Sequence, residues 1–450
     1  MGGRCEQDFI TKITNYVVRK NSVSLEALQR ARLLVLDNLG CILGALDFGP
    51  SIPFLNAYRI SPLAPYFLNP LLLGSLGNLL DFDDTILSQY PPLTGHPGSA
   101  IIPAALAAAI HADVDAKTFF EAVAVGYEVG IRMGLISAPA EGNIRGMGSW
   151  VVFGACSAAA RILLDTEPKV SRALSLAGKF APLPTLSKFA DYSHGEVDWI
   201  KNNLGWASLG GFLAAYLTAN GLKGPAHFFE DPNGFFQMVR SADNISNEKI
   251  NGLGTYSFIN DVALKPYPCC RFIHSSLDAL NQAVEKQRVN MTTLINHIEV
   301  ETASGFAATS LINYPSTEID AQFSIPYTLS ASLILGPWHA GWLRKESIER
   351  RDIISLAQRI VVKKWEKKCP FMAARVTVYY TNGSRVQASV ENPLGDPTNL
   401  LPVNLVKDKF FKLSRLRLGG MSDTLSYEVL GCPDDAMVRE ILRPFLLQCN

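Results

Sequence analysis

Three carboxylates fall within four positions of the segment "DFDDTILSQYPPLTGHPGS", which runs from residue 81 to 99. Read as a helix, the segment would place Asp81, Asp84 and Thr85 on one face, because residues three and four apart are neighbours on a helix. The nearly apolar stretch "LLLGSLGNLL" precedes it, so this face would emerge from the core. A buried, unpaired carboxylate has a raised pKa, which suits acid–base chemistry. Asp83 would point elsewhere and would only cap the helix or contact solvent.

A histidine, His96, follows at the expected start of the helix "PGSAIIPAALAAAI". Histidine is a common proton-transfer group in enzymes, and free amides around Ser99 would favour a bound carboxylate. Two structural interpretations stay open: the acids could be polar residues of a helix end, and the histidine could be an ordinary loop residue. A metal site is disfavoured because no second histidine accompanies this one at ligand spacing. We therefore predict no metal ligands.

A second cluster of polar residues is "KPYPCCRFIHSS", in which Lys265, Arg271 and His274 lie within ten residues. Its positive charge is enough to hold one or two carboxylates. Two prolines predict a rigid turn that leads into a helix starting near Ser275. The adjacent cysteines do not form a C-x-x-C pair and are typical of buried thiols. Neither a G-x-S-x-G elbow nor a phosphate-binding glycine loop is present, so a nucleotide cofactor is not expected.

Composition excludes several classes of protein. The chain has 450 residues, of which 48% are hydrophobic, so it can bury one or more large cores. Lys+Arg and Asp+Glu balance at 41 each, which gives no global attraction to nucleic acid or anionic membranes. The N-terminus resembles no signal or transit peptide, and no apolar stretch is long enough to span a bilayer. Eight cysteines without a secretory signal suggest reduced thiols. We expect a cytoplasmic protein with neither nucleic-acid nor membrane partners.

The first part of the chain is rich in helical patterns. "SLEALQRARLLVLDNLGCILGAL" has apolar residues at helical spacing, with Ser24 as the expected N-cap and Glu26 in the first turn. Three further patterns contain many alanines and glycines, which let helices approach closely. The last of them, "WASLGGFLAAYLTANG", should end at Gly221. These patterns predict one mainly helical domain over residues 1–260.

Strand patterns appear in the second part. "INHIEVETAS" and "ARVTVYYTNGSRVQASVEN" alternate with period two, and Asn382-Gly383 interrupts the second as a hairpin signal. Helical patterns flank them, which predicts a smaller α+β domain over residues 261–394. Residues 395–450 are helical again and should pack on the first domain. The predicted fold class is therefore mainly α: a large helical domain built from both chain ends, with a smaller α+β lid.

Taken together, these stretches resemble the MmgE/PrpD family, which contains 2-methylcitrate dehydratase and cis-aconitate decarboxylase. Their order and spacing along most of the chain are more specific than any one of them. The resemblance implies the same two-domain fold, usually as a homodimer, with an active site between the domains that needs no metal or organic cofactor. The matching stretches are "LDNLGCILGA", "DFDDT", "HPGSAIIPAALA", "GYEVGIR", "FGACSAAA", "KPYPCCRFIHSSLDA", "DAQFSIPYTLSASL", "TNGS", "ENPLGDPTN" and "KDKFFKL".

The resemblance also implies roles for individual residues. Asp81 and Thr85 match an aspartate and a threonine of the family pocket, and His96 and Lys265 match a pocket histidine and lysine. Lys265 would hold a substrate carboxylate and stabilise the charge of an enediolate-like state. His96 would move the proton, with Asp81 orienting it. We assign these residues to catalysis, and we assign Asp84, Arg271, His274 and Lys201 to substrate binding.

The chain also departs from the family pattern. A second pocket histidine of many relatives aligns near Gly148, and a pocket lysine aligns with Glu196 or Asp198, with Lys201 nearby as a substitute. A pocket tyrosine aligns with Phe306 or Ala307. Each lost charged contact weakens tricarboxylate binding by a few kcal/mol. The pocket should therefore be less cationic, which suits a substrate with fewer carboxylates or with a long alkyl part.

These observations predict an enzyme, a cofactor-independent lyase whose partner is a small carboxylate substrate. The leading hypothesis is dehydration of a citrate-like or 2-alkylcitrate-like hydroxy acid by proton abstraction. Three alternatives stay open: decarboxylation of a cis-aconitate-like acid, isomerisation, epimerisation or cyclisation in specialised metabolism, and a non-catalytic paralogue that binds a metabolite.

Overall fold

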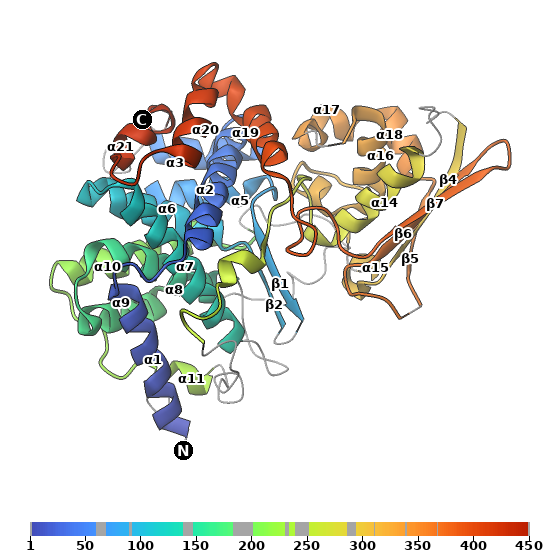
Figure 1. Cartoon of the computed structure of the whole chain (residues 1–450). Coiled ribbons are helices and arrows are strands. Elements are labelled where there is room, and N and C mark those ends of the chain that lie inside the picture. Colours follow the sequence, from blue (N-terminus) through green and yellow to red (C-terminus); the bar gives the residue numbers. More distant parts are fainter. Residues whose placement is uncertain are drawn as a thin grey trace.

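The computed structural model describes residues 2–59, 69–89, 92–137, 147–182, 201–229, 234–238, 252–285, 294–309, 311–337, 340–366 and 368–448. Helices dominate, with one three-stranded and one four-stranded sheet, so the predicted mainly α fold class is confirmed. Figure 1 shows the helical body on one side, the four-stranded sheet with its helices on the other, and β1 and β2 between them.

The helical body is built around α2 (Leu25–Ala45), which is buried along most of its length. Its start is as predicted, because the Ser24 side chain accepts a hydrogen bond from the amide of Ala27 and Glu26 lies in the first turn. The other helices of this part are α1 (Gly2–Val18), α3 (Ile52–Arg59), α5 (Asn69–Leu79), α6 (Gly98–Ala112), α7 (Ala116–Ile136), α8 (Met147–Leu163), α9 (Glu167–Phe180), α10 (Leu204–Ala219) and α11 (Phe235–Met238).

Small residues let α6, α7, α8 and α10 pack closely, as predicted. A Cβ atom added to Gly130 of α7 would lie only 3.0 Å from the Cα atom of Gly154 in α8. Helix α10 ends at Ala219, and Gly221 follows it with a left-handed φ of +93°. The buried alanines and glycines of these helices form a tightly packed core behind the candidate site.

The α+β part contains a four-stranded sheet of order β5-β4-β6-β7. The predicted hairpin is present between β6 and β7, and Gly383 in its turn has φ +83°. The sheet pairs β4 with β5 in parallel and the other neighbours antiparallel. Helix α14 packs on β6 and β7. The strands are β4 (Ile295–Thr302), β5 (Ile360–Lys364), β6 (Ala374–Tyr380) and β7 (Arg385–Val390), and the helices are α14 (His274–Glu285), α15 (Gly305–Thr309), α16 (Ile325–Leu335), α17 (Lys345–Ile348) and α18 (Arg351–Ala357).

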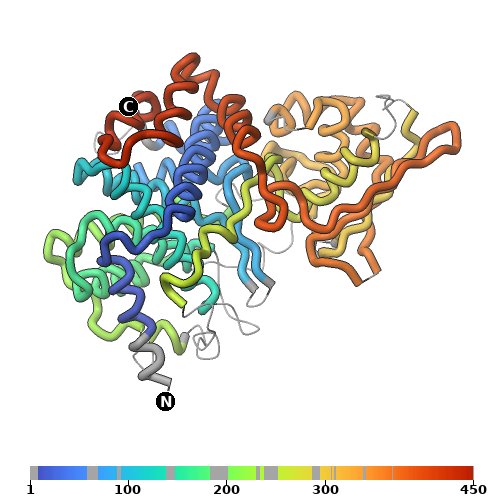
Figure 2. Tube along the Cα trace, in the orientation of Figure 1, coloured from blue at the N-terminus to red at the C-terminus, as the bar shows by residue number. Residues whose placement is uncertain are grey.

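The end of the chain returns to the helical body, as predicted. Helix α19 packs along α2, and the two lie side by side in Figure 2 although they come from opposite ends of the chain. The helices of this segment are α19 (Val403–Leu418), α20 (Met421–Gly431), α21 (Val438–Ile441) and α22 (Arg443–Leu446).

A small antiparallel sheet of order β2-β1-β3 was not predicted. Its strands are β1 (Thr85–Gln89), β2 (Pro92–Gly95) and β3 (Val262–Ala263). Strand β1 follows the acidic residues, β2 ends next to His96, and β3 leads into Lys265. The sheet therefore brings together three segments that carry candidate site residues.

None of the described helices is by itself both long enough and apolar enough to cross a membrane. Within the described residues, α2 and the segment 49–57 together have the length and composition of a membrane span, but the two are bent by 90° relative to each other.

Candidate active site between the helical body and the α+β domain

The acidic segment is a turn rather than the helix predicted from sequence. Helix α5 ends at Leu79, Asp81 has a left-handed φ of +49°, and strand β1 begins at Thr85. The shared helix face of Asp81, Asp84 and Thr85 was therefore wrong. The cause is tertiary, because the Lys265 ammonium donates a hydrogen bond of 2.8 Å to the Asp81 carbonyl and holds this backbone conformation.

The carboxylate of Asp81 lies between two buried lysines. Lys265 Nζ is 3.1 Å from Oδ2, and Lys201 Nζ is 3.5 Å from Oδ1. Burial by itself would raise the pKa of Asp81, but the ammonium groups of Lys201 and Lys265 outweigh it and hold the pKa below its usual range. Asp81 is therefore an anion at neutral pH, and its role is to hold charge rather than to donate a proton.

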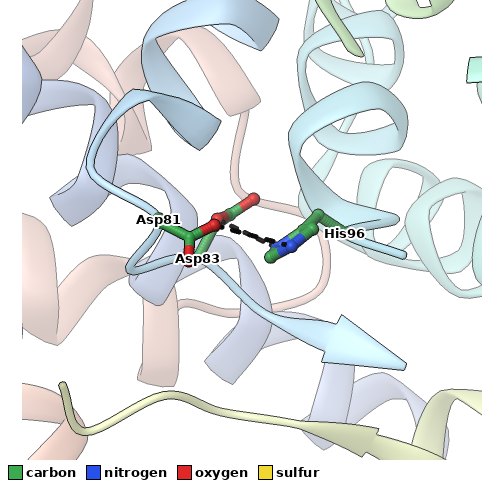
Figure 3. A group of neighbouring side chains, drawn as sticks. All are labelled: Asp81, Asp83 and His96. Atoms are coloured by element: carbon green, nitrogen blue, oxygen red, sulfur yellow. Dashed lines mark ion pairs between the residues drawn. The ribbon is translucent and has the colours of Figure 1, made fainter. Parts of the chain in front are cut away.

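His96 directly follows β2, and its imidazole faces Asp81 and Asp83, which lie together on one side of it (Figure 3). Its Nε2 atom is 3.7 Å from Asp81 Oδ1, and its Nδ1 atom is 3.2 Å from Asp83 Oδ1. The Nδ1 contact is at ion-pair distance but is not aligned as a hydrogen bond. Catalytic hydrogen bonds are often long or poorly aligned in the absence of substrate.

Asp83 is the site residue that the sequence prediction missed. Instead of facing solvent, its carboxylate is fully buried and accepts hydrogen bonds from Asn78 at 3.0 Å and Ser99 at 2.6 Å. Burial alone would raise the pKa of Asp83, but His96, the charge of Lys265 and the hydrogen bond from Ser99 lower it. A weak signal was present in the sequence, because Asn78 is a polar residue in the last turn of the mostly apolar helix α5. In the structure, Asn38 donates a hydrogen bond to Ser99.

Gln322 is a second residue that the prediction missed. It belongs to the α+β domain, and its side-chain oxygen accepts a 2.6 Å hydrogen bond from Lys201 Nζ. Its side-chain amide donates to the carbonyl of Leu79 at 2.8 Å, and its own carbonyl accepts from the amide of Cys270. One side chain thus fixes Lys201 and joins the two domains next to Asp81.

Thr85 and Asp84 lie beside this cluster, with their polar atoms engaged by the fold. The Thr85 hydroxyl donates to the Gly95 carbonyl at 3.0 Å, which ties β1 to β2. Asp84 accepts hydrogen bonds from the Gly98 amide and from the Tyr127 hydroxyl. Burial, and then the charge of Asp83, raise the pKa of Asp84 well above its usual value. Within the described residues, the Thr85 hydroxyl proton and both Asp84 oxygens are already used in hydrogen bonds, and the roles of Thr85 in catalysis and of Asp84 in substrate binding stay predictions.

Arg271 and His274 form contacts that stabilise the turn of residues 265–274, which carries Lys265. Arg271 forms an ion pair with Asp396 at 3.0 Å. His274 Nε2 lies 3.2 Å from the Cys269 carbonyl, and its Nδ1 lies 3.4 Å from Arg271. Burial, followed by the charge of Arg271, holds the pKa of His274 well below its usual value, so the imidazole is neutral. Lys265 is the residue of this turn that reaches Asp81.

The positions that depart from the family pattern are only partly described. Gly148 lies near the start of α8, where an added Cβ would approach Pro182 Cγ to 2.6 Å, so a histidine would require this contact to open. Trp150 packs on Gly95, where an added Cβ would lie 2.4 Å from its ring. Ala307 is buried. Glu196, Asp198 and the side chain of Phe306 lie outside the described residues.

The ligand atoms of Asp81, Asp83 and His96 lie within 4.8 Å of one another, close enough to share a metal ion. The surrounding charges oppose that use. Two ammonium groups stand within 3.5 Å of Asp81, and a cation between the aspartates would be repelled by both. The donor set fits a bound organic anion and a proton-transfer group better than it fits a metal.

Comparisons with known proteins agree with this arrangement. The MmgE/PrpD N-terminal domain model matches residues 11–248, and the MmgE/PrpD C-terminal domain model matches residues 267–424. A cis-aconitate decarboxylase of Aspergillus terreus is 23% identical over 83% of this chain and 82% of its own length. The cis-aconitate decarboxylase-like protein oryM of Aspergillus oryzae is 24% identical over 91% of each chain. The two family models together cover most of the sequence, and the chain therefore belongs to the MmgE/PrpD family, a family of lyase type.

Proposed function

We propose that this protein is a cofactor-independent lyase that dehydrates a citrate-like or 2-alkylcitrate-like hydroxy acid. One observation carries the proposal: His96 faces Asp81 and Asp83 beside two buried lysines, and contacts with the described residues leave each of these lysines a donor to spare. The histidine supplies proton transfer, and the lysines supply charge for a carboxylate.

The lysines can bind an anion without releasing Asp81. An ammonium group has three N–H donors. Among the described residues, Lys265 Nζ contacts the carbonyl and the carboxylate of Asp81, and Lys201 Nζ contacts Gln322 and Asp81. Each lysine therefore keeps one donor for a substrate carboxylate. In a buried site these charge-assisted bonds are stronger than in water.

This geometry supports dehydration. An imidazole protonated at Nδ1 donates to Asp83 and leaves the lone pair of Nε2 free to accept a proton. His96 takes the proton from the carbon next to the bound carboxylate, and the charge spreads onto carboxylate oxygens held by Lys265 and Lys201. The bond between the neighbouring carbon and its hydroxyl oxygen then breaks as the carbon–carbon double bond forms, and protonated His96 passes its proton to the leaving oxygen, which departs as water and leaves an alkene. His96 returns to its neutral state when it releases its proton.

Decarboxylation of a cis-aconitate-like acid is the second candidate, and the names of the relatives favour it. Loss of carbon dioxide leaves the same kind of delocalised anion, which His96 in its protonated form then protonates. The residues are shared between the two reactions, and the difference lies in whether His96 first accepts or first donates the proton.

The experiment separates these reactions. Purified protein is incubated with 2-methylcitrate, longer 2-alkylcitrates and cis-aconitate, while alkene absorbance and released carbon dioxide are followed. Alkene formation from a hydroxy acid, lost in His96→Ala and Lys265→Met, supports the proposal. Carbon dioxide release from cis-aconitate supports the second candidate. If the folded enzyme turns over none of these acids, the proposal fails, and deuterium uptake from D2O without a further mass change would favour an isomerase.

The predicted homodimer and the predicted carboxylate partner stay predictions. Sedimentation in the presence and absence of citrate tests both together.

A further inference from the structure

We propose that Lys409 is a positioning residue that fixes the distance between the Asp81 turn and Lys265. The inference rests on the proposed function, because it assigns a role to the spacing of those two groups. It concerns a part of the molecule that the mechanism does not otherwise use, the C-terminal helix α19.

The ammonium group of Lys409 is buried and has an acceptor for every donor. It donates to Asp37 Oδ1 at 2.6 Å, to the Phe82 carbonyl at 2.6 Å and to the Lys265 carbonyl at 3.1 Å. A lysine has three donors, so all of them are used. Burial by itself would lower the pKa of Lys409, but the Asp37 carboxylate outweighs it and keeps the ammonium charged.

The two carbonyls belong to the two segments that face each other in the site. Phe82 lies between Asp81 and Asp83, and the second carbonyl is that of Lys265 itself. The side chain of Lys265 contacts Asp81 on the substrate side. Lys409 joins the same two segments from behind, so the pair is held at two points.

Helix α19 can serve as a rigid base for this contact. It packs tightly on α2, where a Cβ added to Gly40 would lie 3.2 Å from the Phe410 ring, and one added to Gly44 would lie 2.6 Å from Leu413. Asp37 is on α2 as well, so the ammonium is anchored to both helices. A displacement of Lys409 would require two packed helices to move.

Side-chain packing next to the Lys409 ammonium is incomplete. Its hydrogen bonds to the Phe82 and Lys265 carbonyls therefore contribute more to holding these segments in place. A cavity of about 320 Å³ lies between part of α19 and the segments that carry Phe82 and Pro266, and its lining residues are Phe82, Pro266, Leu405, Asp408, Lys409, Lys412 and Leu413. Close-packed side chains normally hold neighbouring segments in place. Beside this cavity, the Lys409 ammonium joins both segments to α19 directly.

The test compares three variants in α19. Lys409→Met removes the shared donor. Lys412→Met is the matched control, because it removes an exposed lysine from the same helix. Leu413→Ala is the stability control, because it removes a buried side chain without touching either carbonyl. Lys409→Gln, which keeps a neutral donor for one carbonyl, is the second variant if Lys409→Met does not fold.

Hydrogen–deuterium exchange of peptides covering residues 79–89 and 262–270 is the first readout, and it needs no substrate. We expect exchange in both peptides to rise at least tenfold in Lys409→Met and to stay near wild type in both controls. The second readout is kcat/KM on the acid that wild type turns over, with citrate binding as the substitute if it turns over none. We expect at least a tenfold loss in the folded Lys409→Met protein.

Unchanged exchange in either peptide overturns the proposal, and so does full activity or citrate binding in a folded Lys409→Met protein. An equal loss in Leu413→Ala also overturns it, because the effect would then be one of general stability. Hydrogen–deuterium exchange is measured without substrate. Its result therefore tests the role of Lys409 even if the proposed reaction is wrong.

Discussion

The substitution Asp83→Asn tests the arrangement around His96 most directly. It keeps the size of the side chain but replaces one carboxylate oxygen by an amide group and removes the negative charge. Asn78 and Ser99 can still donate to the remaining oxygen, so the buried turn keeps hydrogen-bond partners. What is lost is the anion 3.2 Å from the imidazole Nδ1 atom.

The size of the effect follows from that distance. Two unit charges 3.2 Å apart at an effective dielectric constant of about 20 attract by about 5 kcal/mol, which is an upper bound. Hydrogen bonds to charged groups contribute about 1.5–3 kcal/mol in mutational series. If that stabilisation operates when His96 carries the proton, kcat/KM should fall roughly 10- to 150-fold.

The assay is steady-state turnover of the alkylcitrate that wild type dehydrates, followed by alkene absorbance. Ser99→Ala is the control, because it removes one donor to Asp83 and leaves the carboxylate beside His96. We expect the control to lose less than about fivefold, because the hydrogen bond from Ser99 to Asp83 is present both before and after proton transfer and its contribution largely cancels. If Asp83→Asn folds normally and keeps kcat/KM within twofold of wild type, Asp83 has no part in proton transfer and the reasoning is refuted.

Three further predictions follow from the same structure. Lys201→Met should weaken citrate binding roughly 10- to 150-fold by calorimetry, because it removes a buried charged donor, and unchanged affinity would place the substrate elsewhere. The depressed pKa of His274 contributes stability that is present above its unfolded value near 6.5 and is lost as pH falls, so urea denaturation should show lower stability at pH 5.5 than at pH 7.5. The drop should be smaller in His274→Gln, and an equal drop would assign it to other groups. Dialysis against a chelator should leave activity unchanged, because the lysines beside Asp81 oppose a bound cation, and a loss that zinc restores would contradict this.

Residue types and spacing were enough to predict the two polar clusters and most of the helices around them. Ser24 caps its helix, the chain turns at Asn382-Gly383, and α14 starts within one residue of the predicted position. These features depend on local hydrogen bonds and backbone preferences, which act between neighbours in the sequence.

The conformation of the acidic segment could not be predicted from its own residues. A run of apolar residues followed by three acids has a helical pattern, yet Asp81 adopts a left-handed conformation that is stabilised by Lys265, 184 positions away. The resulting turn buries Asp83 and directs it to His96, which reverses the predicted use of the two aspartates. Gln322 could not be assigned either, because its two side-chain partners lie 121 and 243 positions away.

By itself, the sequence determined the classes of residue available for chemistry, the helical character of both chain ends and the membership of the chain in its family. Only the tertiary structure decided that Asp81 pairs with the two lysines and that Asp83 lies next to the Nδ1 atom of His96. The physical reason is that burial and charge pairing act between atoms that are close in space. A carboxylate acquires its role from the ammonium or imidazole group beside it, and that neighbour is set by the packing of distant segments.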